Sequence, residues 1–232
     1  MGATKLKLGV AASRYDRAPH IFLAAFAGVW VVTAIRPLYF KDWFLENLLV
    51  FAAVPVLVGT YRRFRFSNLS YLLITLFLIL HVIGAHYTYS EVPLGNWLRD
   101  GWQMSRNHYD RVVHFTFGLF LAYPLWEILV RAGIVRKGWS YAVTVHVVFA
   151  WSGVFEVVEA IVAGLVSPEL GAAYNGIQGD IWDAQKDMSL ALIGAVICMI
   201  VTAAFKRNAL PFSGNSPPQF TKALESVHKE LQ

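Results

Sequence analysis

Six long apolar stretches constrain the fold of this chain more than any other feature of its sequence. They cover about residues 19–36, 43–61, 68–88, 112–131, 140–165 and 188–205. About 20 mostly apolar residues form a helix long enough to cross the hydrocarbon core of a bilayer, where a single segment satisfies its backbone polar groups only as a helix. The sequence therefore predicts an all-α fold, a polytopic membrane bundle of six transmembrane helices.

The composition agrees with a membrane protein. Hydrophobic residues make up 56% of the chain and charged residues 15%, whereas a soluble domain has roughly 25% charged residues. The net charge of +5 comes from Lys and Arg scattered between apolar stretches, so we expect membrane lipids and no nucleic acid as partners. The single cysteine, Cys198, excludes an intramolecular disulfide and a cysteine-based zinc site.

The distribution of Lys and Arg predicts the orientation, because cytoplasmic loops hold the excess. The side with both termini carries 14 of these residues and the opposite side carries 6. We expect a cytoplasmic segment at 1–18, a membrane domain at 19–205 and a cytoplasmic tail at 206–232. The first apolar stretch lacks a small-residue cleavage site and is interpreted as an uncleaved helix. The long loops 89–111 and 166–187 are then on the outer side.

Histidine and carboxylate side chains gather where four of these helices meet the outer side. Their segments are HVIGAH, NHYDRVVH, FEVVE and GDIWDAQKD, with His81, His86, His108, Asp110, Arg111, His114, Glu156, Glu159, Asp180, Asp183 and Asp187. Residues three or four apart share a helix face, which holds for Asp110 with His114, Glu156 with Glu159 and Asp183 with Asp187. His81 and His86 are five apart, and we favour His86 because it is nearer the outer end.

Carboxylates in or near hydrocarbon are costly unless they are partnered. Mixed His, Asp and Glu ligands without Cys suit a divalent ion, namely Zn, Mn, Fe or Mg. The assignment that we test has Glu156 and Asp183 as catalytic residues and Arg106 and Arg111 as substrate-binding residues. The metal ligands in it are His86, Asp110, His114, Glu159 and Asp187, and the supporting residues are His108, Asp180 and Gln185.

A purely structural interpretation competes with this assignment. Acids cap helix N-termini and interact favourably with the helix dipole, which would explain Asp180, Asp183 and Asp187. A glutamate of the fifth stretch could pair with Arg111, and Glu127 could pair with Arg131, four residues later.

The quoted segments resemble the YjdF-type family of bacterial inner-membrane proteins, a family defined without a known activity. The resemblance spans about residues 20–205 and implies a multi-pass location in the bacterial inner membrane with a shared polar site. The YDRVVHF segment with the later acids is also similar, more distantly, to the VanZ-like pattern, which has Asn where this chain has Asp187. That second resemblance implies cell-envelope chemistry.

Three classes of function therefore compete. A metal-dependent enzyme would act on a lipid or lipid-linked envelope substrate, with the ion polarising a phosphoryl or carbonyl oxygen. A cation or proton-coupled transporter would need polar residues along the cytoplasmic halves of the helices, where we find little beyond His146 and Glu127. A structural or assembly protein would use the polar cluster only to hold the bundle together.

Overall fold

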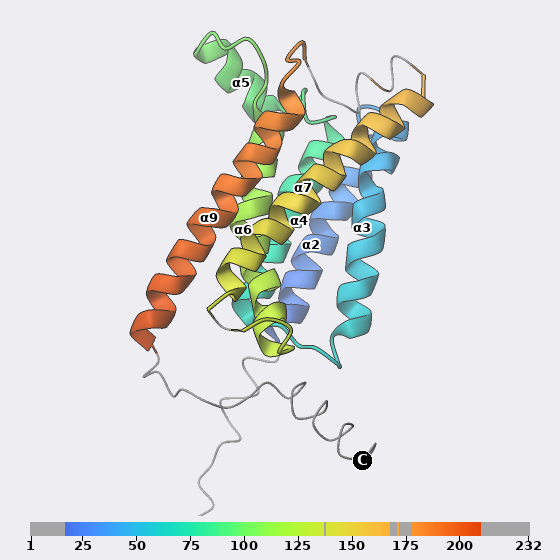
Figure 1. Cartoon of the computed structure of the whole chain (residues 1–232). Helices are drawn as coiled ribbons and strands as arrows, with labels where there is room; N and C mark the ends of the chain where they lie inside the picture. The colour runs from blue at the N-terminus through green and yellow to red at the C-terminus, as the bar shows by residue number, and fades with distance from the viewer. Residues whose placement is uncertain (1–16, 137, 168–170, 172–177, 210–232) are drawn as a thin grey trace, which may run out of the picture. The chain divides into compact units, whose positions relative to one another are not determined.

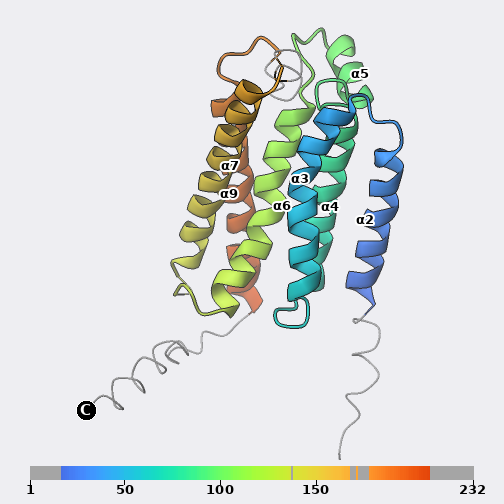
Figure 2. The same ribbon diagram turned by 90° about the vertical axis from the view of Figure 1, so that its right-hand side faces the viewer.

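The computed structural model describes residues 17–136, 138–167, 171 and 178–209. Its helices are α2 (Ala18–Ala34), α3 (Phe40–Thr60), α4 (Asn68–His86), α5 (Pro93–Gly101), α6 (Tyr109–Arg131), α7 (Ser140–Leu165) and α9 (Asp183–Ala209). The described residues contain helices and no strands (Figures 1 and 2), which confirms the all-α prediction. Most of the predicted N-terminal segment and tail lies outside the described residues.

Five of the helices are long and apolar enough to cross a membrane: α3, α4, α6, α7 and α9. They correspond to the last five predicted stretches. The first stretch corresponds to α2, which is apolar but has only 17 residues. The described chain is therefore a multi-pass helical protein with five long candidate spans and one shorter apolar helix.

The chain forms two compact units. Unit 1 comprises Met1–Asp110 and Ala163–Gln178, and unit 2 comprises Arg111–Val162 and Gly179–Gln232. Unit 1 thus contains α2 to α5 and the first residues of α6, whereas unit 2 contains most of α6 and α7 together with α9.

Hydrogen bonds between polar groups join the helices of unit 1. The indole N–H of Trp30 on α2 donates to the side-chain oxygen of Asn47 on α3 at 2.7 Å. On α4, the imidazole nitrogens of His81 and His86 lie 3.0 Å from the carbonyl oxygen of Glu46 and 2.8 Å from that of Thr33. Such bonds hold helices together where lipid removes the hydrophobic driving force for association.

The short amphipathic helix α5 was not predicted. Pro93 occupies its first turn, where the missing N–H has no cost. Gly95 faces Asn107 so closely that a Cβ would lie 1.9 Å from the Asn107 Oδ1. The side chains of Leu94 and Trp97 are 60% and 71% exposed, so α5 presents an apolar face of the kind found at membrane interfaces.

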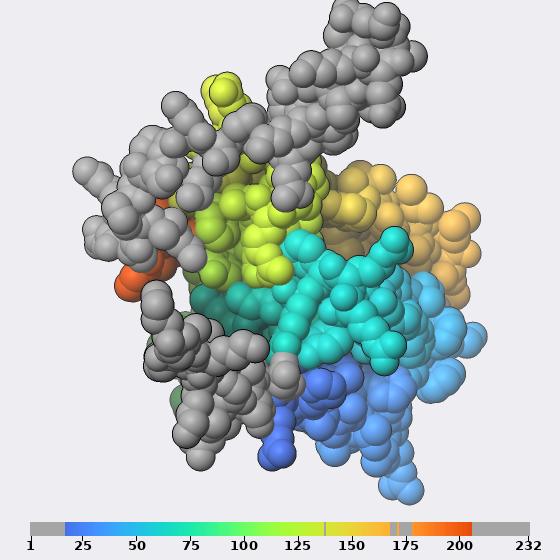
Figure 3. Space-filling model, turned by 90° about the horizontal axis from the view of Figure 1, so that it is seen from below, coloured from blue at the N-terminus to red at the C-terminus, as the bar shows by residue number. Residues whose placement is uncertain are grey.

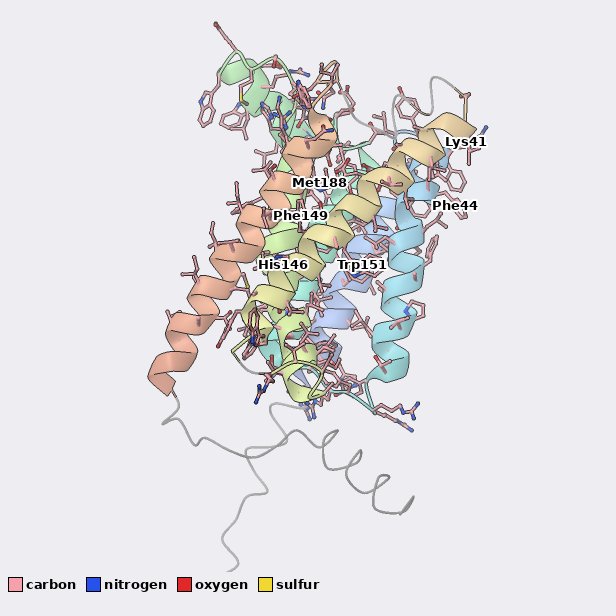
Figure 4. All side chains as sticks on the ribbon, viewed as in Figure 1. Lys41, Phe44, His146, Phe149, Trp151 and Met188 are labelled. Carbon is pink, nitrogen blue, oxygen red and sulfur yellow. The ribbon has the colours of Figure 1, made fainter. Side chains whose placement is uncertain are left out.

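In unit 2, two glycines bring α6 and α9 close together. A Cβ at Gly118 would lie 1.9 Å from the carbonyl oxygen of Ala191, and one at Gly194 would lie 2.3 Å from that of Phe115. Small residues allow this approach in membrane helices. Below the glycines a core forms from Ala122, Trp126, Val148, Ala195, Cys198 and Met199. Phe149 and Trp151 of α7 are exposed on either side of this helix, as expected for side chains that contact lipid (Figure 4).

Replacing Gly118 with alanine is expected to destabilise unit 2 by about 1–3 kcal/mol, the usual cost of overpacking. The added methyl group would collide with the α9 backbone. Thermal unfolding in detergent measures the effect. The matched control is Gly28→Ala, because a Cβ at this helical glycine would meet no atom within 4 Å, and alanine favours the helix. Equal melting temperatures for the two variants would contradict the close packing.

An apolar pocket of about 180 Å³ lies within unit 1, between α2, α3 and α4. Its lining includes Phe22, Phe26, Leu57, Ile74 and Leu78. The loop between α3 and α4 lies beside the start of α2 at the same end of the unit (Figure 3). None of the carboxylates considered below lines this pocket.

Candidate functional site

Three helices of unit 2 supply a cluster of buried polar side chains. Arg111 and His114 lie in the first turns of α6, Glu156 and Glu159 lie in the second half of α7, and Asp183 and Asp187 lie in the first turns of α9. The glycine contacts between α6 and α9 place their first turns side by side.

His114, Glu156 and Glu159 form a compact group. One ligand atom of each lies within 4.8 Å of the others, and the His114 Nε2 lies 3.4 Å from the Glu156 Oε1. His114 is 6% exposed, Glu159 is 9% exposed and the Glu156 side chain is 10% exposed. The predicted three-residue spacing thus brings both glutamates to the histidine.

Arg111 forms the centre of a second group, with the acids that precede and begin α9. Its Nη2 pairs with the Oδ2 of Asp180 and lies 3.3 Å from the Oδ1 of Asp183. The Nζ of Lys186 lies 2.6 Å from the same Asp180 oxygen. Hydrogen bonds from Lys186, from the Trp182 backbone N–H and from Arg111 lower the pKa of Asp180. Asp180 therefore acts both in an ion-pair network and as a local cap, and Arg111 pairs with Asp180 and Asp183.

Helix α9 begins five residues before the predicted start, so the acids Asp183 and Asp187 belong to the helix itself. They are 6% and 2% exposed and one turn apart on one face. Capping explains acids at the exposed end of a helix, whereas burial to this degree requires partners. Gln185, on the opposite side of this turn, is exposed, and its carbonyl oxygen accepts a hydrogen bond from Ser189.

Four of the predicted site residues belong to unit 1. The Nδ1 of His86 contacts the Thr33 carbonyl oxygen, and Arg106 is 3% exposed with its Nε donating to the Asn107 carbonyl oxygen. His108 is half-buried just before α6. Asp110, also half-buried, interacts electrostatically with Glu46. These residues contribute to the structure of unit 1, and the assigned roles of ligand and substrate-binding residue stay predictions.

The structure also contains buried polar residues that the sequence analysis missed. Asp42 and Glu46 on α3 are 1% and 4% exposed. Ser152 lies one turn before Glu156 on α7, is 1% exposed, and its hydroxyl has no hydrogen-bond partner among the described residues. Their four-residue spacing at the start of the apolar stretch 43–61 places both acids on one helix face, but only packing shows that both are buried.

The imidazole of His114 and the carboxylates of Glu156 and Glu159 form a set of possible metal ligands. This donor set matches the ligands that divalent transition metals take in proteins, and it leaves further coordination positions for water or substrate. Two glutamates held 4.8 Å or less from each other would otherwise repel. The donor chemistry therefore fits a divalent ion at His114, Glu156 and Glu159.

Two comparisons with known proteins identify relatives. Residues 18–208 match the family described as "Predicted membrane protein (DUF2238)". The chain is 38% identical over 164 residues to "Inner membrane protein YjdF" of Escherichia coli (strain K12), an alignment that covers 70% of this chain and 78% of that protein. No solved structure matches the chain. These matches confirm the resemblance to the YjdF-type family that the motifs indicated. The chain, with its long apolar helices, belongs to the DUF2238 family of multi-pass membrane proteins.

Proposed function

We propose that this protein is a divalent-metal enzyme of the bacterial inner membrane that acts on a lipid or lipid-linked envelope substrate. The observation that carries the proposal is the buried group of His114, Glu156 and Glu159 in unit 2. The inner-membrane location rests on the similarity to the inner membrane protein YjdF of E. coli. In this proposal α2 is a sixth span, both termini are cytoplasmic, and the polar ends of α6, α7 and α9 are at the outer side.

His114 and Glu159 would hold the ion, and Glu156 would act as a third ligand or as a general base. A divalent ion, when bound, would polarise a phosphoryl or carbonyl oxygen of the substrate. Arg111, whose Nη2 lies 3.3 Å from the Asp183 Oδ1, would hold that carboxylate in place within unit 2, and Asp187 would supply a further buried carboxylate. An acid–base role for Glu156 is consistent with its position against an imidazole at 3.4 Å.

The test of the enzyme is a change in lipid composition. Purified full-length protein is incubated with bacterial membrane lipids, with and without added Mn²⁺ or Zn²⁺, and the lipids are analysed by mass spectrometry. We expect a lipid or lipid-linked species that is consumed only with both metal and wild-type protein, and not with Glu156→Gln. Identical lipid profiles for wild type and Glu156→Gln under all metal conditions would contradict the proposal.

Transport is the second candidate, because buried polar residues continue along one face of α7. Ser140 and Thr144 are fully buried and Ser152 is 1% exposed. However, Ser140 accepts a hydrogen bond from the Trp126 indole, and the Thr144 hydroxyl donates to the Ser140 carbonyl oxygen. On the same helix, His146 is exposed, and its Nδ1 lies 2.7 Å from the Ala142 carbonyl oxygen (Figure 4). These bonds are structural, and uptake of Mn²⁺ into proteoliposomes would be required to favour transport.

A further inference from the structure

A second buried acidic group lies in unit 1, outside the proposed metal site. Asp42 and Glu46 are one turn apart on α3, and they are 1% and 4% exposed. Neither the metal chemistry proposed for unit 2 nor the ion pairs of Arg111 involve them. They therefore require an explanation of their own.

The carboxyl group of Asp42 is buried without a hydrogen-bond partner among the described residues. Both of its oxygens are inaccessible to solvent, and neither has a hydrogen-bond partner among the residues that the structure describes. The nearest amide side chain on α3, that of Asn47, donates to the Trp43 carbonyl oxygen. The Trp43 indole N–H is also buried without an acceptor in the described chain. An ionised carboxylate in these surroundings would be strongly disfavoured.

The groups that interact electrostatically with Glu46 of this pair are themselves carboxyl groups. On α3, Glu46 interacts electrostatically with Asp42 and with Asp110 at the start of α6. Lys41, the second residue of α3, is exposed (Figure 4) and forms no ion pair with any described residue. Helix α2 contributes the Trp30 indole to Asn47, and its titratable residue, His20, is exposed. A second charge on Asp42 would therefore add repulsion.

On α4, the contacts of His81 beside the Asp42–Glu46 pair are satisfied by a neutral imidazole. The Nε2 of His81 lies 3.0 Å from the Glu46 carbonyl oxygen, and its Nδ1 lies 2.5 Å from the Tyr89 hydroxyl oxygen. A neutral imidazole with its proton on Nε2 donates to the carbonyl and accepts from the hydroxyl. His86 directs its Nδ1 to the Thr33 carbonyl oxygen. The two contacts of His81 therefore require no positive charge on its ring.

The geometry favours a proton over a metal ion as the neutralising cation. Within the described residues, no group of three His, Cys, Asp or Glu residues close enough to share an ion includes Asp42 or Glu46. A proton needs only one carboxylate oxygen. We propose that Asp42, with Glu46 beside it, is a proton-binding site of unit 1 and that Asp42 is held as a neutral carboxylic acid at neutral pH.

The proposal is tested on the full-length protein by infrared spectroscopy at neutral pH. A protonated carboxylic acid has a carbonyl stretching band separate from the bands of a carboxylate. We expect wild type to show this band and Asp42→Asn to lose it, whereas Glu91→Gln, which changes an exposed acid, keeps it. Identical spectra in the acid region for wild type and Asp42→Asn would overturn the proposal.

Chemical labelling provides a second test of whether Asp42 is protonated. Dicyclohexylcarbodiimide adds to protonated carboxyl groups in apolar surroundings and leaves an N-acylurea that mass spectrometry of peptides can locate. Labelling of Asp42 that falls as the pH is raised would support the proton site. Because the metal ligands lie in unit 2, loss of metal binding leaves the infrared result unchanged, so the two proposals fail independently.

Discussion

Replacement of Glu159 by glutamine is expected to weaken divalent-ion binding by at least about 100-fold. Losing a residue that only hydrogen-bonds to a metal ligand costs up to about 100-fold in metal affinity, and loss of a ligand itself should cost at least as much. Glutamine keeps the shape of the side chain and removes the charge of a ligand that is only 9% exposed. The affinity for Mn²⁺ and Zn²⁺ is measured by calorimetric titration of the purified protein in detergent.

The matched control is Glu127→Gln. Glu127 is a buried glutamate of α6 in the same unit, and it pairs with Arg131 at 2.5 Å, as its four-residue spacing predicted. Because this residue is outside the proposed site, its replacement is expected to leave the ion affinity unchanged. An unaltered affinity in Glu159→Gln, or an equal loss in both variants, would contradict the proposed ligand set.

Replacement of Arg111 by alanine is expected to produce the largest loss of stability. The Arg111 side chain is only 17% exposed, and its loss would remove a cation that is paired with the buried Asp183. Breaking a buried pair on one side costs about 3 kcal/mol or more, because the remaining charge is uncompensated. The free energy of unfolding, from denaturant titration in detergent micelles, measures this loss.

A second substitution separates the ion pair from general damage to the fold. In the double variant Arg111→Ala with Asp183→Asn, the orphaned charge is removed, so part of the stability should return. Lys186→Ala changes an exposed cation of the same network, 49% exposed, and is expected to have a much smaller effect. A double variant no more stable than Arg111→Ala would show that Asp183 does not depend on this pair.

The apolar pattern predicted the long helices well because hydropathy reports directly which segments can enter lipid. The predicted stretch 140–165 matches α7, and the stretch 68–88 ends two residues after α4. The start of α9 was wrong by five residues because the polar DAQKD segment is helical but not apolar. Helix α5 is short and amphipathic, so no count of consecutive apolar residues detects it.

The sequence predicted which site residues share a face of one helix, but it did not predict the contacts between helices. Periodicity placed Glu156 with Glu159 and Asp183 with Asp187, since residues three or four apart share a face. It could not show that Arg111 pairs with Asp180 and Asp183, because that choice depends on how closely α6 and α9 approach through their glycines. Asp42 and Glu46 were missed because only packing reveals that they are buried.

The most direct test of the central claim combines metal analysis with electron paramagnetic resonance of the Mn²⁺-loaded protein. The account predicts one bound ion per chain, with a single directly coordinated imidazole nitrogen whose signal disappears in His114→Ala. It also predicts that Glu159→Gln loses the ion, whereas Glu127→Gln retains it. A well-folded wild type that binds no divalent ion, or an ion retained unchanged in both His114→Ala and Glu159→Gln, would contradict the account.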